Sequence, residues 1–300
     1  MDRFDALQAF VRVVEAGSFT KAAQTLHMSK TTVSQLVQQL EARLQVKLLN
    51  RTTRQVKVTP EGAAYYERVA RVLGDLQDAD DVLAGDLAAP RGRLRIDVPS
   101  PLARLILMPA LPGFYRRYPD IQLLMGVSDR NVDVIGENVD CVLRGGQITV
   151  PSLVARRVAD LQLGVYASPG YLRETGLPAH PLALEQAPHR MVGYLRSSSG
   201  SIASMPMRRD NESVEVNGRY AVAADDGNAY VAAGLAGMGV LCVPRYMARD
   251  HVKRGELTPL FEEWQLAPMP LYLAYPHNRH LSAKLRVFIA WIDELAAQSL

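Results

Sequence analysis

The stretch that most constrains the fold is residues 18–60, which predict two short helices joined by a tight turn and followed by a basic β-hairpin. Two apolar stripes at helical spacing mark the helices, and residues 27–29 form the turn between them. The stripes consist of Ala22, Ala23 and Leu26, and then of Val33, Leu36, Val37, Leu40 and Leu44. Small alanines suit the close crossing of two helices, so the pattern predicts a helix-turn-helix.

The polar positions of the second helix carry hydroxyls, amides and one cation, with no carboxylate before Glu41. Hydroxyl and amide groups can hydrogen-bond base edges and phosphates, whereas a carboxylate would repel the phosphate backbone. Ser29 can cap this helix and direct its free N–H groups at a phosphate. The alternative is an ordinary solvated amphipathic helix. The candidate DNA-binding residues are Ser29, Lys30, Thr31, Thr32, Ser34, Gln35 and Gln38.

Residues 48–58 predict two short strands around a basic tip, which would form a wing beside the helices. Arg51 and Arg54 can reach phosphates or a narrow minor groove, whose negative potential attracts arginine. The alternative for both is ordinary surface charge, but Lys57 adds to the same hairpin.

The charge distribution agrees with a nucleic-acid module at the N-terminus. Residues 1–60 hold nine Lys or Arg and four Asp or Glu, a net charge of +5 (nine minus four), whereas the whole chain of 300 residues has +3. The remaining 240 residues therefore carry −2 (three minus five). With 48% hydrophobic residues, the chain is an ordinary globular protein of two or three domains.

A long helix is predicted after the wing, from Thr59-Pro60-Glu61 to about Leu87. Its apolar residues recur at alternating three- and four-residue steps over three heptads, which indicates a seam for pairing with a second copy. Asp80 fills one seam position and would either fix the register or face outward where the helices diverge. The predicted dimerisation residues are Tyr66, Val69, Leu73, Leu76 and Leu83.

Beyond the linker at residues 88–92, predicted strands alternate with helices. Strands are expected at 94–98, 121–127, 140–144, 161–167, 191–195, 219–224, 239–243 and 271–275, and helices at 102–118, 131–138 and 281–297. Such alternation predicts parallel sheets covered by helices, in two subdomains with a cleft between them. Ligands of such folds bind beyond the carboxyl ends of the strands.

The N-terminal residues resemble those of LysR-type transcriptional regulators, densely over about sixty residues and more loosely over the rest. The matching residues are Ala22, Ala23, Leu26, Ser29, Val33, Ser34, Leu40, Glu41, Leu44, Leu48, Arg51, Arg54, Val56, Thr59, Pro60, Glu61 and Gly62. The chain departs from the family pattern at Lys30-Thr31-Thr32, where Gln-Pro-Ala is usual. It also has Gln45 where Gly is usual and Leu49 where Phe is usual.

The resemblance implies an α/β chain with a winged helix-turn-helix head, a long dimerisation helix and a two-subdomain effector domain like that of periplasmic binding proteins. It also implies that the chain crosses twice between the subdomains, near Leu161 and Ala267. The expected divisions are 1–60 for the DNA-binding head, 61–90 for the linker helix and 91–300 for the effector domain. Subdomain I would comprise 91–161 and 268–300, and subdomain II 162–267.

Candidate effector residues follow the predicted strands. Ser100 ends the first strand and opens a helix whose N-terminus can take a carboxylate, and Ser128 ends the next strand. Both match serine or threonine ligand positions of the resembled family. The alternative for every candidate is a turn or a helix cap without a ligand. The full candidate set is Ser100, Ser128, Arg144, Arg196, Ser197 and Asp226.

No catalytic constellation, metal-ligand spacing or cofactor motif is evident, so we expect neither an enzyme nor a cofactor. Cys141 and Cys242 are expected to be reduced buried thiols, with a redox pair as the alternative. The apolar runs are too short to span a membrane, and the N-terminus does not match a signal peptide, so a cytoplasmic protein is expected.

These observations predict a ligand-responsive, sequence-specific transcriptional regulator that forms a homodimer or tetramer. Its expected partners are the double-stranded DNA of an operator, a small-molecule effector with an anionic or strongly hydrogen-bonding group, and RNA polymerase as a further candidate. Two alternatives stay open: a constitutive DNA-binding protein, and a solute-binding α/β protein with an accessory helical head.

Overall fold

The computed structural model describes residues 2–51, 56–83, 90–130, 134, 137, 139–146, 152–196, 199–277 and 281–300. The chain forms two compact units, Met1–Ala88 and Ala89–Leu300. Among the described residues, no helix has both the length and the apolar character needed to cross a membrane.

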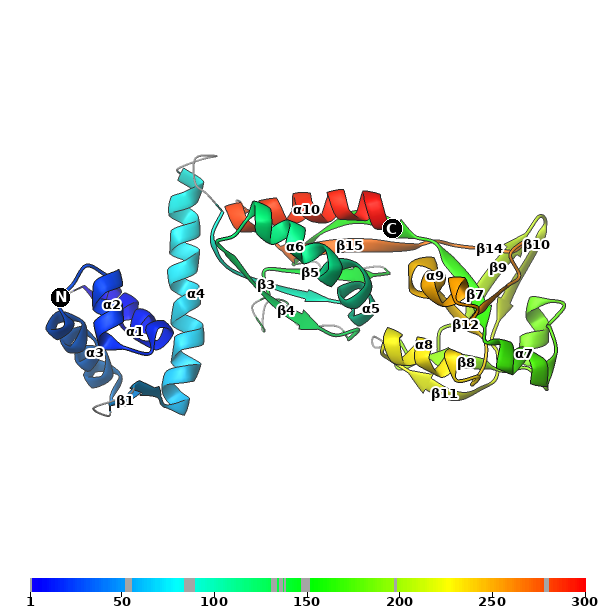
Figure 1. Cartoon of the computed structure of the whole chain (residues 1–300), viewed down its shortest axis with the longest axis horizontal. Helices are drawn as coiled ribbons and strands as arrows, with labels where there is room; N and C mark the ends of the chain where they lie inside the picture. The colour runs from blue at the N-terminus through cyan, green and yellow to red at the C-terminus, as the bar shows by residue number, and fades with distance from the viewer. Residues whose placement is uncertain are drawn as a thin grey trace. The chain divides into compact units, whose positions relative to one another are not determined.

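The N-terminal unit is a winged helix-turn-helix (Figure 1). Helices α1 (Arg3–Ala16), α2 (Phe19–Thr25) and α3 (Lys30–Leu44) precede the antiparallel pair β1 (Leu49–Arg51) and β2 (Val56–Val58), and α4 (Pro60–Leu83) follows. The predicted stripes form the core, because Ala22, Val33 and Val37 are fully buried around Phe10.

Side-chain caps start the helices where the sequence predicts them. The Lys21 amide donates to Ser18 Oγ at 3.4 Å at the start of α2. The Gly62 amide donates to Thr59 Oγ1 at 2.9 Å at the start of α4. Such caps supply an acceptor for N–H groups that have none within the helix. Ser18 therefore caps α2 and Thr59 caps α4.

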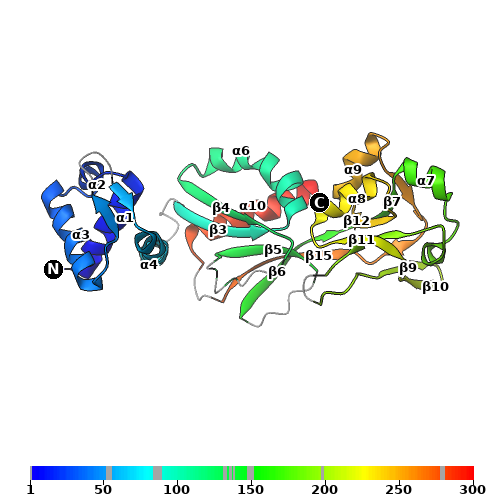
Figure 2. The same ribbon diagram turned by 90° about the horizontal axis from the view of Figure 1, so that it is seen from below.

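The C-terminal unit begins with a five-stranded sheet in the order β4-β3-β5-β15-β6 (Figure 2). Its strands are β3 (Gly92–Val98), β4 (Ile121–Val127), β5 (Cys141–Gly145), β6 (Leu153–Leu161) and β15 (Met269–Pro276). A helical run of α5 (Ser100–Leu102), the π-helix η2 (Ala103–Leu107) and α6 (Met108–Arg117) packs on it with α10 (Ala283–Ser299). Phe114 and Trp291 meet in this core with ring centroids 4.9 Å apart.

In the rest of the unit, the described residues form three smaller sheets. Their orders are β12-β7-β13, β11-β8 and β10-β9-β14. The strands are β7 (Leu163–Ala167), β8 (Met191–Tyr194), β9 (Met205–Arg209), β10 (Glu212–Val216), β11 (Tyr220–Ala224), β12 (Leu241–Pro244), β13 (Thr258–Leu260) and β14 (Gln265–Leu266). The helices are α7 (Pro169–Thr175), η3 (Pro181–Glu185), α8 (Gly227–Leu235) and α9 (Arg245–Lys253).

The sheets are mixed rather than parallel as the alternation of strands and helices predicted. Strands β3, β4 and β5 are parallel, but β15 runs antiparallel to β5 and β6. The chain leaves the five-stranded sheet after Leu161 and returns to it at Met269. A parallel pair of strands needs a crossover connection, whereas β15 follows β14 directly with no helix between them.

Two predicted helices extend past the described residues. The helix expected at 131–138 falls mostly on residues that the structure does not describe, with turns at Val134 and Glu137. The described part of α4 ends at Leu83, so the expected end near Leu87 lies outside the described residues.

Candidate DNA-binding head and effector site

Helix α3 presents a polar face opposite its buried stripe. Lys30, Thr31, Gln35 and Gln38 are exposed, and Ser34 is half-buried. These side chains recur at three- and four-residue steps, so they share one face of the helix. The only carboxylate in α3 belongs to Glu41, which is 4% exposed. The polar face of α3 therefore presents no acidic group.

Ser29 caps α3 and draws Thr32 into the cap. Its Oγ accepts a hydrogen bond from the Thr32 amide at 3.0 Å and lies 2.8 Å from Thr32 Oγ1. The predicted cap at Ser29 is thus confirmed. Thr32 is half-buried and its hydroxyl already has a partner in the protein, whereas Thr31 is exposed.

Glu41 fastens α3 to the start of the wing. Its Oε1 accepts from the amides of Leu48 at 2.9 Å and Leu49 at 3.1 Å, and its Oε2 lies 3.5 Å from Lys47 Nζ. Buried carboxylates are stable when charged donors and N–H groups satisfy them. In the sequence, Glu41 stands out as the first acid after the polar face and as a residue of the family pattern, not as an anchor for the wing. Its position seven residues before an apolar Leu-Leu pair was the available signal.

The wing residues are described only in part. Arg51 ends β1 and pairs in register with Val56, but its side chain is not among those described. Arg54 lies outside the described residues. Their predicted contacts to DNA therefore stay predictions.

The predicted dimerisation residues of α4 divide into two groups. Tyr66 and Val69 are 8% and 6% exposed and pack inside the head against α1. Leu73 is half-buried against the same core. Leu76 and its neighbour Val72 are 45% and 59% exposed, so they remain accessible to a second copy. The side chain of Leu83 lies outside the described set.

In the C-terminal unit, Ser100 lies where strand β3 gives way to helix. Its amide donates to Asp129 Oδ1 at 2.6 Å, and its hydroxyl accepts from Asn228 Nδ2. Asp129 follows β4, and its Oδ2 accepts from the amide of Gly227 at the start of α8. The structure therefore brings Ser100 to a carboxylate, but the carboxylate belongs to the chain.

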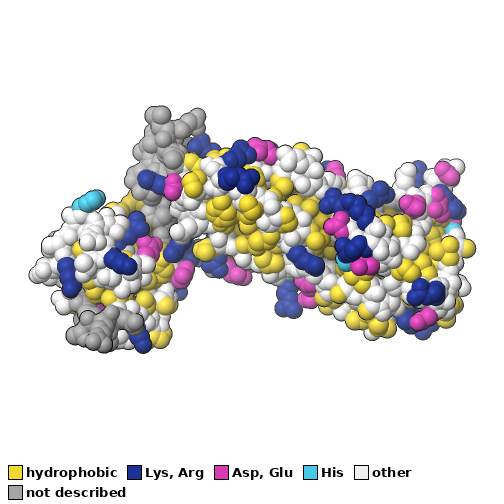
Figure 3. Space-filling view, viewed as in Figure 1, with side chains coloured by type: hydrophobic (Ala, Val, Ile, Leu, Met, Phe, Trp, Pro, Cys, Tyr) yellow, Lys and Arg dark blue, Asp and Glu magenta, His cyan; other side chains and the backbone are white. Residues whose placement is uncertain are grey.

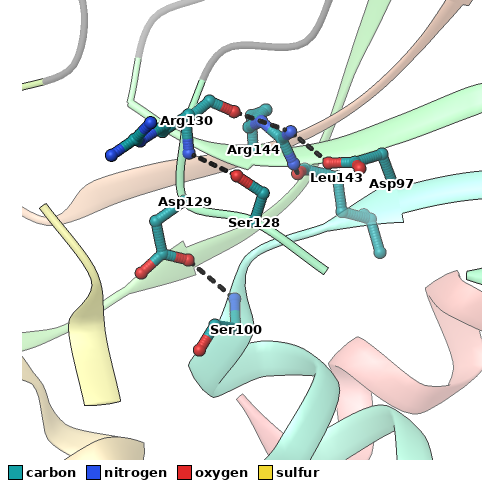
Figure 4. A network of polar contacts seen from close by, with 7 residues as sticks. All are labelled: Asp97, Ser100, Ser128, Asp129, Arg130, Leu143 and Arg144. Atoms are coloured by element: carbon teal, nitrogen blue, oxygen red, sulfur yellow. Dashed lines mark hydrogen bonds and ion pairs between the residues drawn. The ribbon is translucent and has the colours of Figure 1, made fainter. Parts of the chain in front are cut away.

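Ser128 lies beside this contact and makes a local turn (Figure 4). Its Oγ accepts from the amide of Arg130 at 3.1 Å, and the Arg130 guanidinium donates to Asp225 Oδ2 at 3.0 Å. Ser100 and Ser128 thus flank Asp129, a residue that the candidate set lacked. Its place directly after Ser128 was the signal in the sequence.

Arg144 is part of a buried ion pair with Asp97 on the neighbouring strand. Its guanidinium also donates to the carbonyl oxygens of Leu143 at 2.8 Å and Arg130 at 3.0 Å. Arg144 is 9% exposed. These partners give it a structural role in joining β3, β5 and the loop after β4, since Arg presents several donors in a fixed fork.

The remaining candidates follow strands β8 and β11 in the chain. Asp226 caps α8, because its Oδ1 accepts from the amide of Ala229 at 2.8 Å, which agrees with the alternative of a helix cap. Arg196 is exposed, and its carbonyl oxygen accepts from the amide of Gly200 at 2.8 Å in a turn. Ser197 lies outside the described residues.

Tyr194 borders the acidic group formed by Asp129, Asp225 and Asp226. Tyr194 and Tyr230 stack edge to face with centroids 5.4 Å apart. Burial, followed by these three carboxylates, raises the pKa of Tyr194 to about 12. The Tyr194 hydroxyl therefore stays protonated at neutral pH and can donate a hydrogen bond.

Two family models cover nearly the whole chain. Residues 4–63 match the bacterial regulatory helix-turn-helix protein of the lysR family, and residues 88–297 match the LysR substrate binding domain. Together they define a transcriptional regulator with a DNA-binding head and a substrate-binding domain. The chain belongs to the LysR family of transcriptional regulators.

Relatives match along their full length. The chain is 36% identical to an HTH-type transcriptional repressor of Pseudomonas aeruginosa over 299 residues, covering 100% of the chain and 94% of the relative. The solved structure of CrgA, a LysR-type regulator of Neisseria meningitidis, is 32% identical with a TM-score of 0.62 and coverage of 96% and 97%. Full-length AphB of Vibrio cholerae, named a virulence activator, is 28% identical with a TM-score of 0.59 and coverage of 97% and 98%.

Proposed function

We propose that this regulator binds operator DNA through the exposed face of α3 and the wing, and that a small effector bound by the C-terminal unit alters that binding. The observation that carries the proposal is the acid-free face of α3, where the one carboxylate of the helix is buried against the wing. Exposed hydroxyls, amides and a lysine match the donors and acceptors of base edges and phosphates.

The proposed DNA contacts are ordered by exposure. Lys30, Thr31, Gln35 and Gln38 are exposed and would meet the groove directly. Ser29 and Thr32 would act mainly by capping α3, which directs its positive N-terminal end at a phosphate. Arg51 and Arg54 would contact the backbone or the minor groove from the wing.

The proposed assembly is a homodimer or tetramer that pairs α4 helices, with Val72 and Leu76 in the contact. A second apolar surface lies on the C-terminal unit, where Figure 3 shows hydrophobic side chains gathered over α6. Met108 and Tyr115 of α6 are 46% and 38% exposed there. Two such surfaces would allow a dimer of dimers, and two heads match two operator half-sites.

The proposed effector site lies around Ser100 and Ser128, between two subdomains. Subdomain I would comprise residues 91–161 and 268–300, and subdomain II residues 162–267. Separate sheets and cores support this division into two subdomains. The proposed partners are double-stranded DNA, the effector and RNA polymerase, all met in the cytoplasm. Catalysis is no part of the proposal.

The test is protection of DNA upstream of the chain's own gene by the purified protein, with and without metabolites chosen by thermal shift. A ligand at 100 times its dissociation constant adds about 2.7 kcal/mol of stability. We expect one protected site whose boundaries change with a stabilising metabolite. Protection that no stabilising metabolite changes would favour a constitutive DNA binder, and no protection of any site would contradict the proposal.

A further inference from the structure

Asp129 joins the starts of two helices that follow strands of different sheets in the C-terminal unit. Ser100 is the first residue of the helical run after β3, and Gly227 is the first residue of α8. The first N–H groups of a helix have no acceptor within the helix. The two carboxylate oxygens of Asp129 supply one acceptor to each.

Other contacts close the same junction. Asn228 Nδ2 donates to Ser100 Oγ, and Arg130 Nε donates to Asp225 Oδ2 at 3.0 Å. A Cβ added at Gly227 would lie 2.5 Å from Pro101 Cγ and 3.2 Å from Asp129 Oδ2. The α8 start therefore lies against Pro101 with no room for a side chain.

We propose that Asp129 is a latch that holds the two subdomains of the C-terminal unit together in the resting protein, and that the effector acts by changing its engagement. The link to the effector rests on the proposed function, whereas the latch is a property of the chain alone. An effector that brings a carboxylate to the Ser100 amide must displace Asp129, because that amide already has an acceptor.

Opposing effects act on the pKa of Asp129. Burial raises the pKa of Asp129, while the amides of Gly227 and Ser100 oppose that rise. The nearby charge of Asp226 raises the pKa further and that of Arg144 lowers it. The ionised carboxylate therefore loses hydration on closing and gains two charge-assisted hydrogen bonds. Small changes in either quantity shift the balance.

The first experiment measures backbone amide exchange at single-residue resolution in the full-length protein without DNA or ligand. In Asp129→Ala we expect the amides of Ser100 and Gly227 both to exchange at least about tenfold faster, since each loses its carboxylate acceptor. Asp160→Ala removes an exposed carboxylate that pairs with Arg157 and serves as the matched control. Unchanged exchange at both amides in a folded Asp129→Ala protein would overturn the latch.

Added formate then tests whether a carboxylate is what the latch requires. Alanine retains Cβ, so formate can take the position of the missing carboxylate and restore protection in Asp129→Ala. Formamide and sodium chloride at equal concentration should restore none, and wild-type protein should not respond. Equal effects of formate and chloride would overturn the assignment of the two amides to a carboxylate.

A steric variant tests the latch with Asp129 left in place. Gly227→Ala pushes a methyl group against Pro101, so the Ser100 amide should lose protection although its own residue is unchanged. Gly113→Ala adds the same methyl where the nearest atom, of Arg116, is 3.8 Å away, and should have no effect. Full protection at Ser100 in Gly227→Ala would count against the latch. These exchange measurements use no operator DNA. Their outcome therefore does not depend on whether the proposed DNA binding is correct.

Discussion

The hydroxyl oxygens of Ser29 and Thr32 lie 2.8 Å apart at the start of α3, so the two residues form one cap. Thr31, between them, is exposed and faces away from this pair. In the first turn of α3, Ser29 and Thr32 therefore form the cap, whereas Thr31 remains exposed. We therefore expect Thr31, rather than Thr32, to contact a base.

Thr31→Ala should cost about 1–3 kcal/mol of binding at the operator if Thr31 contacts a base edge, with little change on random DNA. Thr32→Ala should lower affinity on both DNAs alike, because it weakens the cap rather than a base contact. Fluorescence anisotropy with operator and scrambled duplexes measures both. A loss of affinity for the operator alone in Thr32→Ala would instead show that Thr32 contacts a base.

Arg51→Ala and Arg54→Ala should each weaken binding to every sequence, because a phosphate contact carries no base information. Each should also reduce the slope of log affinity against log salt concentration by about one. Arg173→Ala in the C-terminal unit removes an exposed cation outside the head and should leave the slope unchanged. An unaltered slope in both wing variants would contradict their role.

Leu76→Asp should shift the assembly toward monomer, since it places a charge on an exposed apolar position of α4. Tyr66 and Val69 are poorer test sites because they also stabilise the head. Ala64→Asp adds the same charge at an exposed position off the predicted seam and should leave the assembly intact. Sedimentation velocity measures both, and a folded Leu76→Asp protein with wild-type sedimentation would refute the pairing of α4.

Gln45→Gly should raise the free energy of unfolding of the head by about 1 kcal/mol. Gln45 caps the end of α3 with φ of 55°, a left-handed conformation that costs residues with a Cβ about 1–2 kcal/mol. Loss of its side-chain hydrogen bond to the Ala42 carbonyl and greater freedom in the unfolded chain offset part of this gain. Urea unfolding followed by circular dichroism provides the measurement, and a destabilised variant would show that the hydrogen bond outweighs the strain.

Asp129 should make the stability of the C-terminal unit depend on pH. Burial raises its pKa above the ordinary value of 3.8, so folding favours the protonated form. The stability that this residue contributes is present below pH 3.8 and is lost as pH rises through the raised pKa. The difference in unfolding free energy between wild type and Asp129→Asn should therefore fall as pH rises from 3.8 through the raised pKa of Asp129. The charges of Asp225, Asp226, Arg130 and Arg144 are common to both proteins, and a difference independent of pH would contradict the shift.

The head was predictable because its determinants are local. The stripes, the turn and the caps at Ser18, Ser29 and Thr59 each connect residues within a few positions of one another. The sequence does not reveal Glu41 as the wing's anchor, because that role depends on a backbone amide presented by a different element. Tyr66 and Val69 fit a heptad, yet the same spacing also serves burial against α1.

The C-terminal unit was predictable as strands and helices but less so in its pairing. Ten expected elements have described counterparts, whereas the β9–β10 hairpin was not anticipated although Asp210 and Asn211 lie at its turn. The contact between Asp129 and Gly227 joins residues 98 positions apart. A contact between residues so far apart leaves no periodic pattern in the sequence. The effector candidates could therefore be placed at strand ends, but their hydrogen-bond partners could not be predicted.

Glu41 sets the wing against α3 through backbone amides, and the exposed side chains of Lys30, Thr31, Gln35 and Gln38 take no part in that attachment. These four side chains can therefore be exchanged without disturbing the buried stripe or the wing. A transplant of the four residues from a relative should carry that relative's operator preference while the wing keeps its place. The departure at Lys30-Thr31-Thr32 from the usual family residues is where we expect this chain's binding preference to differ, while Glu41 holds the wing through backbone amides alone.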